Sequence, residues 1–307
     1  MASVRKMAGK VAVGISSWTE PTLVKQGNFY PRGVSTAEER LKFYASQFPI
    51  VEVDSTYYFP PSERNAALWI ERTPKEFTFN VKAYSLLTNH PTKVESLYKD
   101  VREALPAALL EKKNVYRDKL PAEVAEQVWG RFRDALMPLH SAGKLGAVLF
   151  QFPQWFVIGR KSKDYILECR DRLPDYRIAA EFRHKTWMSG PNREETLAFL
   201  EENDITFVCV DMPQGFDSSL PSVAEVTAKD LAMVRFHGRD PSAWQTRGGT
   251  AAERFRYDYS KQELQEWVPK VEALAEHAAE THVIMNNCYR DYAVRSARQL
   301  AGLLADE

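Results

Sequence analysis

Charged and amide side chains follow the apolar segments of this 307-residue sequence at their carboxyl ends. In the stretch 177–187 the apolar run 178–180 is followed directly by Glu181 and then by Arg183. A short apolar run bounded by polar residues is typical of a buried parallel strand. Because parallel strands end at one face of a sheet or barrel, the residues that follow them would share a single site.

The same pattern recurs at other segments and gives a set with acids, bases, amides and cations. Its members are Glu52, Asp54, Lys82, Gln151, Glu181, Arg183, His184, Asp211, Arg235, His237, Asn286 and Asn287. One interpretation is an active site; the alternative is a layer of structural salt bridges, because buried charges need partners in either case. For a single residue both stay open. The whole set favours a ligand site, because apolar residues would fill a barrel at lower cost.

The catalytic candidates are Glu181, His237 and Asp211. A carboxylate and an imidazole can each exchange a proton near neutral pH when the surroundings shift the pKa modestly. Glu181 and His237 are therefore the candidates for general acid and base.

Substrate binding is assigned to three chemical groups of residues. Cations can hold a carboxylate or phosphate, amides can orient hydroxyls or a carbonyl, and aromatic rings can stack on a sugar or base. The aromatic rings have core packing as their alternative. The residues are the cations Lys82, Arg183 and Arg235, the amides Gln151, Asn286 and Asn287, and the rings Trp18, Tyr57 and Trp187.

Glu52 and Asp54 are the candidates for a metal site, because their oxygens suit Mg²⁺, Mn²⁺ or Zn²⁺. The sequence contains no HxH or HExxH run, and carboxylates and cations can neutralise one another without metal. No cofactor is predicted, and a divalent metal is kept as an alternative.

Eight strand-like segments must position these residues. Strand-helix alternation of this length predicts a single α/β domain over 1–307, a closed (β/α)8 TIM-type barrel. A doubly wound sheet would place a glycine-rich loop after its first strand, and neither GxGxxG nor GxxxxGK[ST] occurs. The strand segments are 11–18, 49–56, 77–83, 146–153, one within 177–187, 206–212, 231–238 and 281–287.

A helical insertion, 84–143, separates the third and fourth predicted strands. It shows no strand pattern, two helical patterns at 94–110 and 122–139, and a basic turn at 111–119. A connection this long is often functional, so it serves either as a cover for the barrel or as a lid over the site.

Composition narrows the classes of partner. Lys+Arg and Asp+Glu balance at 41 each, which disfavours nucleic acid as a partner, although the basic turn keeps that alternative open. The most apolar stretch, 147–158, is too short to span a bilayer, and residues 1–10 contain no secretory core. Three cysteines without metal spacing indicate reduced thiols and a cytoplasmic location. The sequence leaves the oligomeric state open.

Several motifs, in this order, resemble the DUF72 (YecE-like) family. They are GISSW at 14–18, FYP at 29–31, VEVDSTYY at 51–58, FTFNVK at 77–82, LGAVLFQFP at 145–153, EFRHKTW at 181–187, VRFHG at 234–238 and NN at 286–287. The resemblance covers nearly the whole chain and implies a TIM-type barrel without implying a reaction. Asp54 stands where many members have Asn, residues 15–17 are Ile-Ser-Ser where Thr-Ser-Gly is common, and 84–143 is longer than in minimal members.

The sequence thus predicts an uncharacterised barrel enzyme, a hydrolase, lyase or isomerase, that acts on a small anionic or sugar-like substrate at the carboxyl ends of its strands. Two alternatives belong to other classes: a metal-dependent nuclease or repair-like barrel, and a non-catalytic ligand-binding protein.

Overall fold

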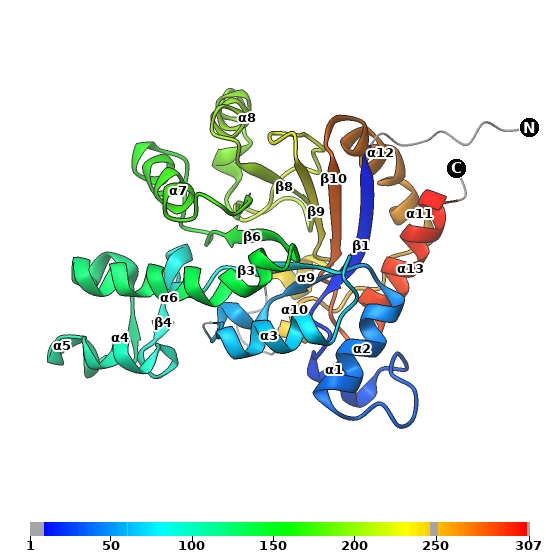
Figure 1. Ribbon diagram of the computed structural model, residues 1–307. Helices are drawn as coiled ribbons and strands as arrows, with labels where there is room; N and C mark the ends of the chain where they lie inside the picture. Colours follow the sequence, from blue (N-terminus) through cyan, green and yellow to red (C-terminus); the bar gives the residue numbers. More distant parts are fainter. Residues whose placement is uncertain (1–8, 60, 246–250, 306–307) are drawn as a thin grey trace, which may run out of the picture.

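Eight parallel strands form a closed barrel in the computed structural model, which describes residues 9–59, 61–245 and 251–305 (Figure 1). The order around the barrel is β1-β10-β9-β8-β7-β6-β3-β2, and β1 closes it by pairing with both β10 and β2. The predicted barrel is therefore confirmed. The strands are β1 (Lys10–Ser16), β2 (Ile50–Val53), β3 (Thr78–Lys82), β6 (Leu145–Gln151), β7 (Ile178–Glu181), β8 (Thr206–Asp211), β9 (Leu231–Phe236) and β10 (Glu280–Met285).

The strands are buried along almost their whole length. Every residue of β2, β7, β8 and β9 is buried, including the charged residues at their carboxyl ends. Apolar side chains fill the space between barrel and helices, while charged side chains occupy part of the barrel interior. The predicted pattern of apolar strands with charged ends is therefore present.

Helices surround the barrel (Figure 1), and none in the described ranges is long and apolar enough to cross a membrane. Capping boxes formed by Thr36 with Glu39 and by Ser260 with Glu263 begin two of the helices. The helices are α1 (Pro21–Gln26), α2 (Ala37–Gln47), α3 (Glu63–Glu71), α4 (Lys99–Glu103), α5 (Ala107–Leu110), α6 (Ala122–Ser141), α7 (Arg160–Arg172), α8 (Asn192–Glu202), α9 (Pro241–Gln245), α10 (Ala251–Arg254), α11 (Lys261–Gln265), α12 (Val268–His277) and α13 (Tyr292–Ala305).

The segment 84–143 differs in part from the prediction. Its second helix is present as α6, which buries Val128, Phe132 and Leu136. The helix predicted over 94–110 is wrong: the chain forms only α4 and α5 there, with Pro106 between them, because proline has no N–H and its ring blocks a continuous helix. A two-residue antiparallel pair, β4 (Thr92–Lys93) with β5 (Asn114–Val115), has no counterpart in the prediction. Figure 1 shows α4 and α5 projecting to the left of the barrel.

The close approach of β1 and β2 yields a stability test. A Cβ atom on Gly14 would lie 2.1 Å from the Ile50 carbonyl oxygen, so Gly14→Ala must displace backbone. We expect it to lower the free energy of unfolding by roughly 1–3 kcal/mol or more, as overpacking does. Gly130→Ala is the matched control, because that Cβ would have no neighbour within 4 Å on α6 and alanine favours helix by about 0.5–1 kcal/mol. Urea unfolding that ranks both variants equally would contradict this packing.

Candidate functional site

Arg235 on β9 joins two carboxylates inside the barrel. Its Nε donates to Glu52 Oε2 at 2.8 Å, its Nη2 donates to Glu52 Oε1 at 2.5 Å, and its Nη1 donates to Glu181 Oε2. All three side chains are at most 1% exposed. Ser16 Oγ donates a further hydrogen bond to Glu52 Oε1 at 3.2 Å. Charges this deeply buried persist only when each is paired, and Arg235 pairs both acids.

The second oxygen of Glu181 is also occupied. Gln151 Nε2 donates to Oε1 at 2.6 Å, His237 Nε2 lies 3.1 Å from it, and Arg183 Nε forms an ion pair with it at 2.7 Å without hydrogen-bond alignment. Burial alone would raise the pKa of Glu181, but Arg183, Arg235 and His237 outweigh it and hold the pKa well below its usual range. Glu181 is therefore a fixed carboxylate, which corrects the expectation that it exchanges a proton near neutral pH.

His237 is a neutral member of this network. Asn286 Nδ2 lies 2.9 Å from His237 Nδ1, so Nδ1 accepts and Nε2–H donates to Glu181. Burial and the neighbouring Arg183 charge lower the pKa of His237 to about 3, although Glu181 opposes them. His237 therefore orients Glu181 and, like it, does not exchange a proton near neutral pH in this geometry.

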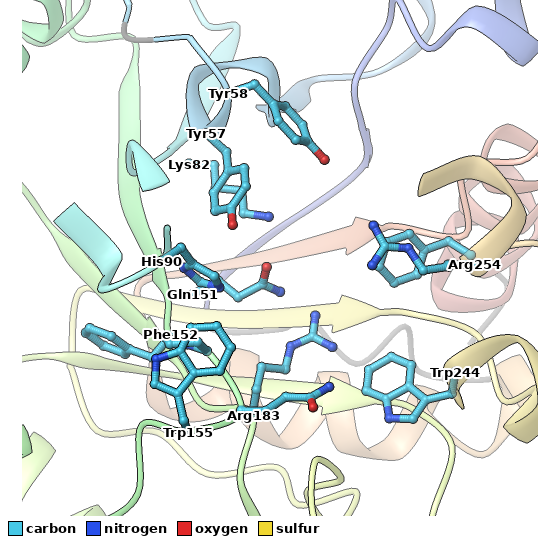
Figure 2. A pocket seen from close by; sticks show the side chains of 13 residues that line it. Tyr57, Tyr58, Lys82, His90, Gln151, Phe152, Trp155, Arg183, Trp244 and Arg254 are labelled. Carbon is cyan, nitrogen blue, oxygen red and sulfur yellow. The ribbon is translucent and has the colours of Figure 1, made fainter. Parts of the chain in front are cut away.

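An open cavity of about 400 Å³ lies at the ends of the strands (Figure 2), and it adjoins the network because Gln151 and Arg183 belong to both. Lys82, Gln151 and Arg183 extend into it from β3, β6 and the residues after β7, and Arg254 faces them from α10. No carboxylate belongs to its described lining. The residues that line it are Tyr57, Tyr58, Lys82, His90, Gln151, Phe152, Pro153, Gln154, Trp155, Arg183, Trp244, Arg254 and Phe255.

Lys82 brings a titratable amine into this cavity. Its Nζ lies 4.6 Å from the centroid of the Tyr57 ring. Burial and the Arg235 charge lower the pKa of Lys82 to about 8, while Glu52 and other carboxylates act in the opposite direction. Lys82 can therefore gain or lose a proton close to neutral pH.

The segment 84–143 supplies part of the cavity wall through His90. The imidazole lies 5.2 Å from the Tyr57 ring and 5.8 Å from the Trp155 ring, and burial followed by the Lys82 charge lowers its pKa to about 3. The segment therefore does more than cover the barrel; its closure as a lid stays a prediction. Trp155 could have been found from the sequence because it follows β6 closely, whereas His90 and Trp244 lie in segments without a strand-end pattern.

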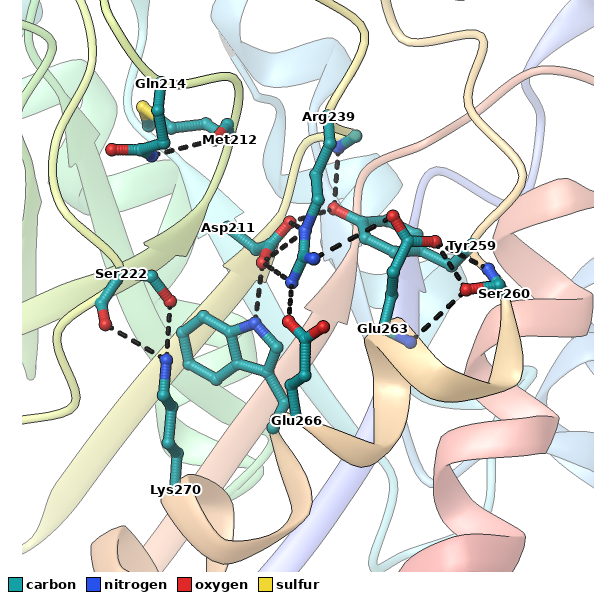
Figure 3. A network of polar contacts seen from close by, with 12 residues as sticks. Asp211, Met212, Gln214, Ser222, Arg239, Tyr259, Ser260, Glu263, Glu266 and Lys270 are labelled. Atoms are coloured by element: carbon teal, nitrogen blue, oxygen red, sulfur yellow. Dashed lines mark hydrogen bonds and ion pairs between the residues drawn. The ribbon is translucent and has the colours of Figure 1, made fainter.

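Asp211 belongs to a different network of polar contacts (Figure 3). It accepts hydrogen bonds from Arg239 at 2.8 Å, from the Tyr259 hydroxyl at 2.7 Å and from Trp267 Nε1 at 2.6 Å. Successive side chains of a strand point to opposite faces, and that of Asp211 points to α11 and α12. The structure thus corrects the expectation that Asp211 shares a catalytic site with Glu181 and His237.

Two of the predicted stacking rings belong to the core. Trp187 is fully buried, stacks on Phe182 with centroids 4.0 Å apart, and donates its indole N–H to the Phe156 carbonyl at 2.6 Å. Trp18 is 7% exposed and packs edge-on against Trp69. Of the three rings, Tyr57 lines the cavity.

The two asparagines also differ in their placement. Asn286 contacts His237, as described above. Asn287 donates instead to the Tyr257 carbonyl at 2.9 Å and to Ser296 Oγ at 3.1 Å. It therefore fixes the chain after β10 to α13 and does not face the cavity.

The acidic residues considered for a metal are not assembled into a coordination shell. Both oxygens of Glu52 accept from Arg235, and burial raises the pKa of Asp54 although the Lys82 charge opposes this. Within the described ranges, no group of three or more His, Cys, Asp or Glu side chains could hold a metal ion. Glu52 thus belongs to the charge network in this arrangement, whereas Asp54 forms no ion pair with the described residues.

Removing the cation that Glu52 and Glu181 share should destabilise the protein strongly. Arg235→Met leaves Glu52 and Glu181 without their common partner, and we expect the free energy of unfolding to fall by roughly 3–5 kcal/mol. Lys42→Met, which breaks the exposed pair with Glu38, is the control and should cost about 0–1 kcal/mol. Chemical denaturation measures both, and similar losses would argue against the buried bridge.

Stability should fall on acidification because of His237. Its pKa of about 3 in the native state lies below the unfolded value of 6.5, so the unfolded state binds a proton first as the pH falls from about 6.5 to 3. His237→Gln keeps a donor and an acceptor but removes this titration. Between pH 6.5 and 4.5 its stability should fall by about 1–3 kcal/mol less than that of the wild type. The control is His140→Gln on the outside of α6, and an unchanged slope in His237→Gln would contradict the neutral buried imidazole.

Comparison with known proteins places the chain in a family. Residues 12–307 match the family model described as "Protein of unknown function DUF72". The UPF0759 protein YunF of Bacillus subtilis (strain 168) is 30% identical over 298 residues, covering 96% of this chain and 94% of that protein. A DUF72 family protein of Thermotoga maritima, solved at 2.20 Å, is similar with a TM-score of 0.75 and 32% identity over 97% of this chain and all of that one. One from Enterococcus faecalis has a TM-score of 0.77 and 27% identity over 96% and 95% of the two chains. The chain therefore belongs to the DUF72 family.

Proposed function

We propose that the mouth cavity binds a small anion that carries a ring, and that the protein is an enzyme acting on it. The observation that carries this proposal is the charge of the lining: three cations, Lys82, Arg183 and Arg254, and no carboxylate among the described lining residues. The whole chain has no net charge, so the positive potential is local to the cavity.

The aromatic side chains support a ring in the ligand. Tyr57, Trp155 and Trp244 line the cavity, and Trp155 and Tyr58 are 59% and 51% exposed. The Arg183 guanidinium lies 5.0 Å from the centroid of the Trp244 ring, so a cation and an aromatic face are presented together. Such pairs suit planar carboxylates and phosphorylated sugars, whose anionic end takes the cation and whose ring takes the aromatic face.

Catalysis, as opposed to binding alone, is supported by the cavity's chemistry. Lys82 combines a pKa of about 8 with direct access to the cavity, and perturbed groups of this kind concentrate at active sites. The location at the carboxyl ends of the barrel strands agrees with barrel enzymes generally. The metal-dependent nuclease alternative gains no support from the donor geometry. Turnover of a bound ligand would distinguish an enzyme from a binding protein.

Anion binding can be tested at Arg254, which is exposed and stands outside the buried network. Benzoate, glucose 6-phosphate and neutral benzyl alcohol are titrated by calorimetry and thermal shift. We expect the anions to bind wild type, and Arg254→Gln to weaken the binding by about three- to tenfold through loss of one charge contact. Arg160→Gln, a 95% exposed arginine at the start of α7, should have no effect. Equal binding of benzyl alcohol and the anions, or equal effects of both variants, would overturn the proposal.

A further inference from the structure

Lys82 differs from Arg183 and Arg235 of the buried network in having no carboxylate within ion-pair distance in the described part of the chain. Arg235 pairs with Glu52 and Glu181, and Arg183 pairs with Glu181. The Lys82 ammonium lies over the face of the Tyr57 ring. Its nitrogen points into the open cavity (Figure 2).

The surrounding charges leave a protonated Lys82 uncompensated. Two arginines and two glutamates make the buried network neutral without Lys82. Burial of Lys82 and the Arg235 charge disfavour the protonated form of its amine. The carboxylates of Glu52, Glu181 and Asp54 favour the protonated form, although they lie beyond ion-pair distance. Arg183, Arg254 and His90 also line the same cavity, and none of them adds negative charge. A neutral amine with a free lone pair is therefore accessible near neutral pH, which is the condition for a nucleophilic lysine.

We propose that Lys82 Nζ is a nucleophile that forms an imine with the carbonyl carbon of an anionic aldehyde or ketone bound in the mouth cavity. This inference rests on the proposed function, because Arg183 and Arg254 must hold the anionic end while the carbonyl reaches Lys82. Figure 2 shows Lys82 and Arg254 entering the same open space from different sides. The substrate class is thus narrowed to carbonyl compounds with an anionic group.

The reaction needs no oxidant or metal to balance. The lone pair of Nζ forms a bond to the carbonyl carbon, the carbonyl π electrons move to oxygen, and a proton passes from nitrogen to that oxygen. The hydroxyl of the resulting carbinolamine takes one proton from a hydronium ion of the solvent in the open cavity, its C–O bond breaks, and water leaves. Neutral amine, carbonyl compound and proton therefore give a protonated imine and water. The imine can withdraw electrons from the adjacent carbon, as required for a lyase or an isomerase.

The test is reductive trapping on the full-length protein with 4-formylbenzoate, an aromatic anion with an aldehyde, and benzoate as the matched anion without one. Cyanoborohydride reduces an imine to a stable secondary amine, which intact mass and peptide mapping locate. At pH 7 an amine with a pKa of about 8 is neutral in about a tenth of molecules, against about one in 2,500 for an ordinary lysine. We expect Lys82 to be labelled at least about tenfold faster than exposed lysines, with a rate that rises through pH 8.

Two variants make the result specific. Lys82→Arg keeps the positive charge and should bind benzoate but lose the fast label. Lys10→Arg, at the start of β1 and thus at the opposite end of the barrel, should be labelled like wild type. Circular dichroism confirms that each variant is folded, and Lys82→Met provides a second variant if the arginine does not fit.

The outcomes separate the two proposals. Fast labelling confined to Lys82, and slowed by benzoate, supports the imine. Binding of both probes with label spread evenly over surface lysines overturns the imine and leaves the anion site standing. If neither 4-formylbenzoate nor benzoate binds, and the wild type is labelled no faster than Lys82→Arg, both the imine and the anion site are overturned.

Discussion

The pairing of Arg235 with Glu52 and Glu181 is the constraint on which the site depends. It ties β2, β7 and β9 together across the barrel interior, where none of the three charges can be solvated. Loss of the cation would leave two buried carboxylates uncompensated, so the geometry is fixed strongly. Glu181 in turn holds Gln151, Arg183 and His237 by its other oxygen. The positions of Gln151 and Arg183, which form the floor of the cavity, therefore depend on one guanidinium group.

The charged side chains of the barrel fall into two groups: those paired within the buried network, and Lys82 at its edge. The buried network is neutral as a set, and its carboxylate and imidazole have pKa values far from neutral pH. Lys82 stands at the edge of the network, where it is buried but forms no ion pair with the described residues, and its pKa is about 8. The polar side chains of the barrel thus contribute in two ways: most position their neighbours, and Lys82 faces the open cavity without an ion pair to the described residues.

Different parts of the chain form the walls and the floor of the cavity. Strand ends supply Lys82 and Gln151, while the loops and short helices supply Trp155, Trp244 and Arg254. The segment 84–143 adds His90 from outside the barrel pattern. Loops tolerate sequence change better than strands do, so substitutions are accommodated more readily in these walls than in the buried charge network.

The sequence by itself determined the eight strands, the barrel and the strand-end residues Lys82, Gln151 and Arg183, because apolar runs and their charged ends are local patterns. Tertiary structure decided which strand-end residues meet. Asp211, Asn287 and Trp187 pack toward helices or the core, because the direction of a side chain depends on the face and loop that carry it. It alone brought His90 and Arg254 into the cavity, since they are distant in sequence and follow no strand. It also decided the protonation of Glu181, His237 and Lys82, because a pKa is set by burial and by neighbouring charges that only the closed barrel brings together.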